Sequence, residues 1–494
     1  MESQGPTDAA TLAWCSGASR VRSQARRYAP LTHPARRAVV HARAMGRGMP
    51  PAGALELGMV AREGRIVHEV RFFRPTTPHT MQLQSILRRL HPIPRFVYDR
   101  VEWRGRSLLA HVHPRRGCKA LCSSCARKRP TYDTASPRTF AFVPLWGVAV
   151  SLSYAMRRVD CPRCGVRVEM IPWASGKSQT TFAFIWFLAS WAKLLAWKQV
   201  AQRFRTSWDT VFRAVEHAVL WGLENRPLDD VGAIGVDELA WKKGHKYLTL
   251  VYQIDNGCRR LLWIGKNRTR ESFHDFFDML GDERSKAIRF VASDMWSAFL
   301  SVVKKRASSA VHVLDRFHVA QLLSKAVDTV RRQEVRALRA RGQHAVLTKT
   351  RWLLLKRHEN LTDHQHDRLR DLVRINLRSV RAYLLKERFN GFWTYHSPAW
   401  AGRFLDRWTT QAMRSRMPPF KTFATTLRKH RELLLNWFRA RGAFAHGATE
   451  GFNNKARITT RKAYGFRTYE HAETALYHAL GNLPEPPWLT HRFS

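Results

Sequence analysis

The stretch Val231-Gly-Ala-Ile-Gly-Val-Asp237-Glu238 is an apolar run that ends in two acidic residues. A second run, Ile288-Arg-Phe-Val-Ala-Ser-Asp294, also ends in an acid. Short apolar runs of this kind predict buried strands. Between them, strand-like patterns cover residues 246–255 and 260–266, and the spacing over 270–280 predicts a helix. The predicted order is therefore three strands, one helix and a fourth strand.

This order is that of a ribonuclease H-like fold. Short turns such as Asn256-Gly257 are typical of antiparallel strands, and the fourth strand is expected beside the first. The side chains of Asp237 and Asp294 would then converge at adjacent strand ends. Three other acids also lie near strand ends and compete for these positions: Glu238, Asp255 and Asp315. Asp315 is the strongest rival for the second position.

Carboxylates that converge in this way suit two-metal phosphoryl transfer, in which two magnesium or manganese ions sit about 3.5–4 Å apart. A third carboxylate completes such a site, and Glu450 is the candidate. If its segment is helical, Glu450 shares a face with residues three and four positions later. The polar and basic residues of this segment are predicted to contact DNA: Asn453, Asn454, Lys455, Arg457, Arg461 and Lys462.

Four of the seven cysteines form two CxxC pairs, Cys122-Ser-Ser-Cys125 and Cys161-Pro-Arg-Cys164. Two such pairs close a tetrahedral zinc site, which is structural because no coordination position stays open. Paired thiols of this kind are typical of metal binding in a reducing compartment and not of a disulfide scaffold. Cys118 lies close enough in sequence to replace one ligand, so an alternative ligand set stays open.

A helix-turn-helix is predicted between the zinc-ribbon segment and the strand-rich segment. Residues 194–204 have helical spacing, and Arg205-Thr206-Ser207 then supplies a break and a hydroxyl cap for a second helix from Trp208. The second helix of such a motif enters the major groove. Arg205, Ser207 and Arg213 are the predicted DNA contacts, and a plain helical hairpin is the alternative.

The charge balance points to a polyanionic partner. The chain has 84 Lys and Arg residues against 38 Asp and Glu residues, a formal charge of +46. Self-repulsion of this size favours nucleic acid as the partner. A membrane surface is disfavoured because the basic residues are spread through helical segments. The most apolar stretch, Thr181–Trp197, is short, contains Lys193 and predicts a buried helix.

Residues 1–80 differ in composition from the rest, since they contain no lysine and are rich in Ala, Gly and Pro. Met81 then opens a helical pattern. A start codon set too far upstream explains this best, with Met81 as the true start. A disordered basic arm and an arginine-rich transit peptide are the alternatives, and the acidic residues of the stretch weaken the latter.

From about residue 81 to about residue 480 the chain resembles the ISL-three family of bacterial insertion-sequence transposases. The resemblance rests on these motifs: Cys161-Pro-Arg-Cys164-Gly165, Gly235–Glu238, Ser293-Asp294-Met295, Asp315-Arg-Phe-His-Val319, Tyr383-Leu-Leu-Lys-Glu387, Glu450-Gly-Phe-Asn-Asn-Lys455 and Ala463-Tyr-Gly-Phe466. It implies a catalytic triad of Asp237, Asp294 and Glu450, with a helical insertion between the second and third acids. One departure is Ala445-His446, where Ser-Asn is expected.

The predicted architecture is multidomain α/β: a ribonuclease H-like core with a long all-α insertion, preceded by a β-rich zinc ribbon and a helix-turn-helix. The expected divisions are an extension at 1–80, the zinc ribbon at 81–175, the helix-turn-helix at 176–228, the core at 229–319 and 444–494, and the insertion at 320–443.

The expected function is that of a DNA transposase in the bacterial cytoplasm, associated with the nucleoid. It would bind the terminal inverted repeats and target duplex as a homodimer or higher oligomer, and cut and join strands with magnesium or manganese. The alternatives are a non-catalytic DNA-binding regulator, and a ribonuclease H-like nuclease that cuts without joining.

Overall fold

The computed structural model describes residues 58–62, 65–69 and 82–490, except 243, 245, 344, 345, 442 and 444–446. The chain divides into two compact units, Met1–Thr80 and Met81–Ser494. In the first unit, strands β1 (Gly58–Arg62) and β2 (Arg65–Glu69) form an antiparallel pair. The rest of the 1–80 extension lies outside the described residues, and so does the Ala445-His446 departure.

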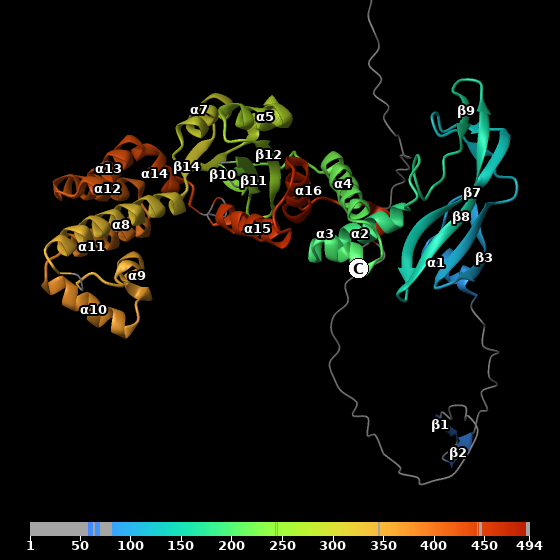
Figure 1. Ribbon diagram of the computed structural model, residues 1–494, viewed down its shortest axis with the longest axis horizontal. Helices are drawn as coiled ribbons and strands as arrows, with labels where there is room; N and C mark the ends of the chain where they lie inside the picture. Colours follow the sequence, from blue (N-terminus) through green and yellow to red (C-terminus); the bar gives the residue numbers. More distant parts are fainter. Residues whose placement is uncertain are drawn as a thin grey trace, which may run out of the picture. The chain divides into compact units, whose positions relative to one another are not determined.

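The second unit is mixed α/β with a helical C-terminal region (Figure 1). It opens with helix α1 and a twisted sheet in the order β3-β4-β8-β7, with β9 paired to β8. The bounds are α1 Leu83–Leu90, β3 Phe96–Arg104, β4 Ser107–Pro114, β7 Thr131–Leu145, β8 Val148–Cys161 and β9 Gly165–Val168. Two short strands, β5 (Ala120–Leu121) and β6 (Lys128–Arg129), pair separately. Trp173 is buried against Phe96 and Tyr154, with ring centroids 4.9 and 5.4 Å away.

Three helices follow: α2 (Phe182–Leu194), α3 (Trp197–Arg203) and α4 (Trp208–Asn225). The single helix predicted over 194–204 is wrong at its start, because α2 ends at Leu194 and α3 begins three residues later. The Gln199 side chain accepts a hydrogen bond from the Ala196 N–H at 3.0 Å and so caps a new helix. The predicted cap at Ser207 is confirmed, since its hydroxyl accepts from the Thr210 N–H. No helix in the described ranges is both long enough and apolar enough to span a bilayer.

The central sheet has the order β12-β11-β10-β13-β14. The bounds are β10 Ala233–Lys242, β11 Lys246–Ile254, β12 Arg259–Lys266, β13 Phe290–Ser293 and β14 Val311–Leu314. Strands β10, β11 and β12 are antiparallel, whereas β13 lies parallel to both β10 and β14. The predicted position of the fourth strand beside the first is therefore confirmed.

One detail of the first strand was predicted wrongly. The strand does not end at Asp237 and Glu238 but continues to Lys242, because its antiparallel pairing with β11 extends to the pair Lys242 and Lys246. Its pairing with β13 stops earlier, at Gly235 and Ala292. Asp237 therefore lies inside β10 and just beyond the last pair formed with β13.

Helices cover both faces of this sheet (Figure 1). On one face, α5 (Arg270–Leu280) and α7 (Ser297–Arg306) bury Phe273, Phe276 and Phe299 against the inward side chains of β10 and β13. The short helix α6 (Asp282–Ala287) follows α5. The opposite face carries α15 (Ala448–Lys462) and α16 (Tyr469–Leu480), and α17 (Pro487–Thr490) follows.

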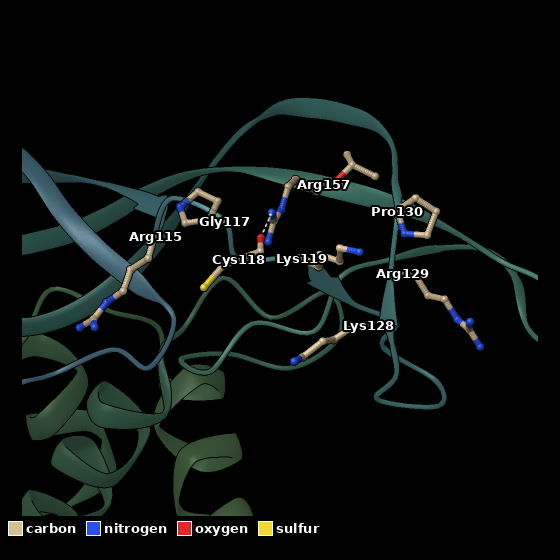
Figure 2. A pocket seen from close by; sticks show the side chains of 10 residues that line it. Arg115, Gly117, Cys118, Lys119, Lys128, Arg129, Pro130 and Arg157 are labelled. Atoms are coloured by element: carbon tan, nitrogen blue, oxygen red, sulfur yellow. Dashed lines mark hydrogen bonds between the residues drawn. The ribbon is translucent and has the colours of Figure 1, made fainter.

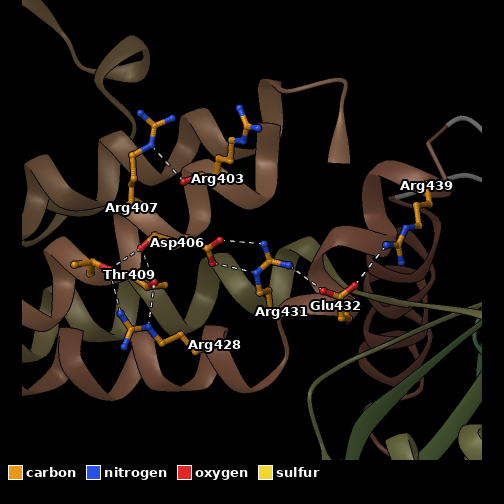
Figure 3. Close-up of polar contacts among 9 residues, drawn as sticks. Arg403, Asp406, Arg407, Thr409, Arg428, Arg431, Glu432 and Arg439 are labelled. Atoms are coloured by element: carbon orange, nitrogen blue, oxygen red, sulfur yellow. Dashed lines mark hydrogen bonds and ion pairs between the residues drawn. The ribbon is translucent and has the colours of Figure 1, made fainter. Parts of the chain in front are cut away.

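The segment between β14 and α15 is helical and basic. Its α-helices are α8 Arg316–Ala340, α9 Arg351–Leu355, α10 Asp363–Arg374, α11 Arg378–Asn390, α12 Pro398–Arg414, α13 Pro418–Lys429 and α14 Arg431–Arg439. Trp408 is buried between Phe389 and Phe423. At the surface, the Arg431 guanidinium bridges Asp406 and Glu432 and ties α12 to α14 (Figure 3).

Candidate catalytic and metal-binding sites

Three acids follow one another across the parallel strands of the central sheet. The β10–β13 register ends at Gly235 and Ala292; two residues later stand Asp237, still within β10, and Asp294, just past the end of β13. The β13–β14 register ends at Ser293 and Leu314, and the residues that follow these strands are Asp294 and Asp315. We call Asp237, Asp294 and Asp315 the acid row.

The carboxylates of the acid row are close enough to repel one another. The Asp237 side chain is buried, with 8% of the residue exposed. Burial raises the pKa of Asp237, and the negative charges of Asp315 and Asp294 raise it further, while His318 and the Glu238 N–H act in the opposite direction. Buried carboxylates that repel one another favour a nearby cation.

Two cationic side chains lie among these acids, and neither was predicted. His318 on α8 places Nε2 3.7 Å from Asp237 Oδ1 and Nδ1 3.3 Å from Asp315 Oδ2. Burial lowers the pKa of His318, but the neighbouring carboxylates outweigh burial and raise it to about 9. The sequence did contain a signal, since His318 belongs to the Asp315-Arg-Phe-His motif.

Arg268 is the second cation. It forms an ion pair with Glu238, and its Nη2 lies 4.0 Å from Asp294 Oδ2. Its guanidinium stacks 4.4 Å from the centroid of the Trp296 ring. Burial raises the pKa of Glu238 to about 7 even though Arg268 opposes this shift. No sequence pattern pointed to Arg268, which simply follows β12.

Helix α15 is attached to the acid row through Asn453. Asn453 Nδ2 donates a hydrogen bond to Asp237 Oδ2, and the Tyr252 hydroxyl donates to Asn453 Oδ1 at 3.0 Å. The Phe452 ring stacks on Tyr252 with centroids 4.7 Å apart. Gly235 permits this close approach, because a Cβ there would lie 2.5 Å from Thr449 Oγ1. Asn453 is only 5% exposed, so the prediction that it contacts DNA needs correction.

Glu450 lies in the first turn of α15, one turn before Asn453, and its residue is exposed. Within the described ranges, Glu450 makes no hydrogen bond or ion pair. Its carboxylate is not gathered with those of Asp237 and Asp294 into a group of atoms within 4.8 Å of one another. The rival Asp255 lies at the other end of β10, where it accepts from the Gly232 N–H at 3.2 Å.

The other predicted DNA contacts differ in their exposure and in the partners that they already have. Lys462 is already engaged, since its Nζ donates to the carbonyls of Ala192 and Lys193 at the C-terminal end of α2, at 3.2 and 3.0 Å. This corrects the prediction that Lys462 contacts DNA. Arg213 is exposed and pairs with Asp209 on its own helix at 2.9 Å. The remaining predicted contacts are exposed: Arg205, Ser207, Asn454, Lys455, Arg457 and Arg461.

The four cysteines of the CxxC pairs meet at one end of the β7–β8 hairpin. The sulfurs of Cys122, Cys125, Cys161 and Cys164 all lie within 4.8 Å of one another and could hold a metal ion. A hydrogen bond from the Arg127 backbone lowers the pKa of Cys125, which favours the thiolate. Cys118 lies outside this group, and its carbonyl accepts from Arg157 Nη1 at 2.9 Å.

A cavity of about 670 Å³ is lined by Cys118 and by Lys128 and Arg129, which follow the first CxxC pair in the chain (Figure 2). Its cationic lining residues are Arg115, Lys119, Lys128, Arg129 and Arg157. Arg157 is held by Glu169 at 2.7 Å, and Glu169 is itself buried and accepts from the Tyr154 hydroxyl. Arg115, Lys119 and Lys128 are exposed and give the cavity lining a positive character, whereas Arg129 is half-buried.

The chain is similar in sequence to known proteins. A family model of ISL3-type DDE transposases, described as "Transposase", matches residues 234–476. The transposase for insertion sequence element IS1001 of Bordetella parapertussis is 31% identical over 76% of this chain and 92% of its own length. The transposase for IS1557 of Mycobacterium tuberculosis is 32% identical over 74% of this chain and 86% of its own length.

The chain belongs to the ISL3 family of insertion-sequence transposases. In this transposase the family match begins within β10 and ends within α16. It therefore contains the acid row, the helical segment and α15 with Glu450.

Proposed function

We propose that this transposase binds the terminal inverted repeats of its element and cuts and joins DNA strands at a ribonuclease H-like core. One observation supports this above all: Asp237 and Asp294 each stand two residues past the last β10–β13 pair, and α15 with Glu450 is joined to Asp237 by the hydrogen bond from Asn453. The order of three antiparallel strands followed by two parallel ones also supports a core of this kind.

The acid row fits divalent cations. Carboxylate oxygens are the ligands that magnesium and manganese prefer. Burial raises the pKa of Asp237 first, and the charges of Asp315 and Asp294 raise it further, so a bound cation would stabilise the ionised carboxylate. Asp237, Asp294 and Glu450 would hold the ions. When bound, two ions supply charge stabilisation for in-line attack at a phosphodiester.

The residues around the acids have positioning roles in this proposal. Asn453 and Tyr252 fix the Asp237 carboxylate, since the Asn453 amide bridges this carboxylate and the buried Tyr252 hydroxyl.

Water would attack the phosphodiester at the element end and break the P–O3′ bond, which leaves a 3′ hydroxyl. That hydroxyl would then attack a target phosphodiester, form a new P–O bond to the target strand and break the target P–O3′ bond, which releases a target 3′ hydroxyl. His318 and Arg268 lie where they could face the phosphate oxygens.

DNA recognition is assigned to separate elements. Zinc at the four cysteines would act structurally and hold the basic cavity of Figure 2 in shape. Helix α4 would enter the major groove, with Arg205, Ser207 and Arg213 at its start. The exposed Asn454, Lys455, Arg457 and Arg461 of α15 would follow the backbone next to the acid row.

Assembly and location follow from the same chemistry. Two element ends must be held together during transfer, so a homodimer or higher oligomer on DNA is expected. Strand cleavage and transfer would take place at the nucleoid, in the bacterial cytoplasm.

Cleavage and joining assays on DNA taken from the two sides of the gene test the proposal. Purified protein, magnesium and a plasmid target should give end-specific cleavage and joining, and Asp237→Asn, Asp294→Asn and Glu450→Gln should abolish both. Asp278→Asn, an exposed carboxylate on α5 that pairs with Arg306, is the matched control. Loss with Asp315→Asn together with activity of Asp294→Asn would move the second acid to position 315. Tight end binding without strand chemistry in the unaltered protein would contradict the proposal.

A further inference from the structure

Two β-hairpins of the N-terminal sheet end side by side. Strands β3 and β4 are joined at Gly105-Arg106, and strands β7 and β8 at Trp146-Gly147. Strand β4 runs parallel to β8, and its first residue, Ser107, pairs with Ala149. Because parallel strands begin at the same edge and neighbouring strands lie about 4.8 Å apart, the two turns are adjacent. We call this edge the hairpin tips.

The hairpin tips expose large side chains that no folding role explains. Trp146 is 83% exposed and Trp103, at the end of β3, is 68% exposed. In the described part of the chain, Trp146 makes no ring or cation–π contact. Its backbone adopts φ 50°, in the left-handed region, and Gly147 follows at φ 83°. Asn-Gly is the preferred pair for such a turn, so tryptophan is a poor choice for folding alone.

The charges of the hairpin tips are positive. Arg104 and Arg106 flank the first turn and are exposed, and neither guanidinium has a hydrogen bond or ion pair within the described ranges. The nearby acid, Glu102, is occupied by His111 at 2.9 Å and by Arg100 at 3.6 Å. The hairpin tips therefore carry the exposed guanidinium groups of Arg104 and Arg106 and the exposed indole of Trp146, and Arg104 is attracted to Glu102 at longer range.

We propose that the hairpin tips are a separate contact with duplex DNA, with Arg104 and Arg106 at phosphates and Trp146 against the sugars and base edges of a groove. Guanidinium groups bind phosphate oxygens, and apolar side chains contact base edges and sugars in the grooves of duplex DNA. The formal charge of +46 favours DNA over a protein as the partner of this surface. This inference rests on the proposed DNA-binding function.

The position of the contact along the DNA follows from the length of the sheet. The four cysteines lie at the opposite end of the β7–β8 hairpin, since Cys161 is the last residue of β8 and Val148 is its first (Figure 1). At about 3.3 Å per residue, the two ends are about 40 Å apart. At about 3.4 Å per base pair this corresponds to about 12 base pairs. The sheet would thus contact DNA at two places, roughly one helical turn apart.

Binding of the full chain to duplexes taken from the two sides of the gene tests the proposal, with a scrambled duplex as reference. Trp146→Asn should lower the affinity about tenfold. Its fold should be kept or stabilised because Asn-Gly suits the turn. Trp146→Phe, with the same backbone requirement, should retain most of the affinity.

The double variant Arg104→Gln/Arg106→Gln should reduce the slope of log affinity against log salt concentration by about two. Arg100→Gln, whose guanidinium is paired with Glu102, is the matched control and should leave the slope unchanged. In a hydroxyl-radical footprint, Trp146→Asn should remove protection about 12 base pairs from the segment that Lys128→Gln exposes.

Unchanged affinity and footprint in Trp146→Asn, while the unaltered protein binds the flanking duplexes, would overturn this inference and leave the proposed function standing. Failure of the unaltered protein to prefer those duplexes would instead overturn the proposed function. Unchanged DNA binding together with loss of a solution oligomer would assign the hairpin tips to a second copy of the chain, against the proposal.

Discussion

The four-cysteine group and the acid row are both candidate metal sites, but they are built differently. The cysteines form a closed set, with all four sulfurs within 4.8 Å of one another. The acid row is open: cationic side chains lie between its carboxylates, and Glu450 stands exposed on a separate helix. Closed ligand sets serve folding, whereas catalytic sites keep positions for substrate. The comparison teaches that the cysteine group is complete with its own four ligands, whereas the acid row depends on side chains from distant segments that hold its carboxylates in place.

Loss of a cysteine should have the largest effect. Cys161→Ser should remove bound zinc and destabilise the N-terminal sheet by about 5 kcal/mol, because metal binding contributes directly to folding. Metal analysis and thermal unfolding would measure both. Cys118→Ser is the matched control, since Cys118 lies outside the group, and equal damage from the two variants would refute the four-cysteine assignment.

The stability of the structure next to the acid row should fall at low pH. His312 on β14 is buried and contacts the Ser293 hydroxyl at 2.7 Å, next to Asp294. Burial, and then His430, lowers the pKa of His312 from its ordinary value of 6.5 to about 4. The unfolded chain therefore binds the proton first as the pH falls, so stability present above pH 6.5 is lost towards pH 4.

The loss should be on the order of 3 kcal/mol for this single group. It would be measured as the free energy of unfolding between pH 7 and pH 4. His312→Gln should flatten that part of the profile, and an unaltered profile in the variant would assign the acid sensitivity to other groups.

The hydrogen bond from Asn453 on α15 to Asp237 should contribute to divalent-ion binding and to catalysis. Asn453→Ala removes the amide that joins Asp237 to Tyr252, and should weaken divalent-ion binding and strand cleavage about 10- to 100-fold. Calorimetry with calcium measures binding without turnover. Thr459→Val on the same helix, which loses only a hydrogen bond to the Lys455 carbonyl, is the control. Equal losses in both variants would indicate damage to the helix and not to the acid row.

The smallest effect is expected at the far end of α15. Lys462→Met removes two hydrogen bonds to the C-terminal carbonyls of α2 and should cost about 1 kcal/mol of stability. Denaturant unfolding would detect this loss. DNA affinity should stay unchanged in Lys462→Met but fall in Arg461→Gln, because Arg461 is exposed. The opposite result would restore Lys462 as a DNA contact.

Much of the central sheet, the cysteine group and the start of α4 could be predicted because their signals are local. Apolar runs located β10 and β13, the two CxxC pairs located the cysteine group, and Ser207 marked the start of α4. The end of β10 could not be predicted from its own sequence, since its neighbours decide it: β11 extends the strand to Lys242, while β13 releases it after Gly235.

The sequence by itself determined which segments become strands and helices, and which residues carry thiolates or carboxylates, because periodicity and capping act over a few residues. Only the tertiary structure decided that Arg268 and His318 neutralise the acids, that Asn453 is buried on Asp237, and that Lys462 caps α2. These contacts join residues far apart in the chain. Their partners are selected by strand register and helix packing, which no local pattern records.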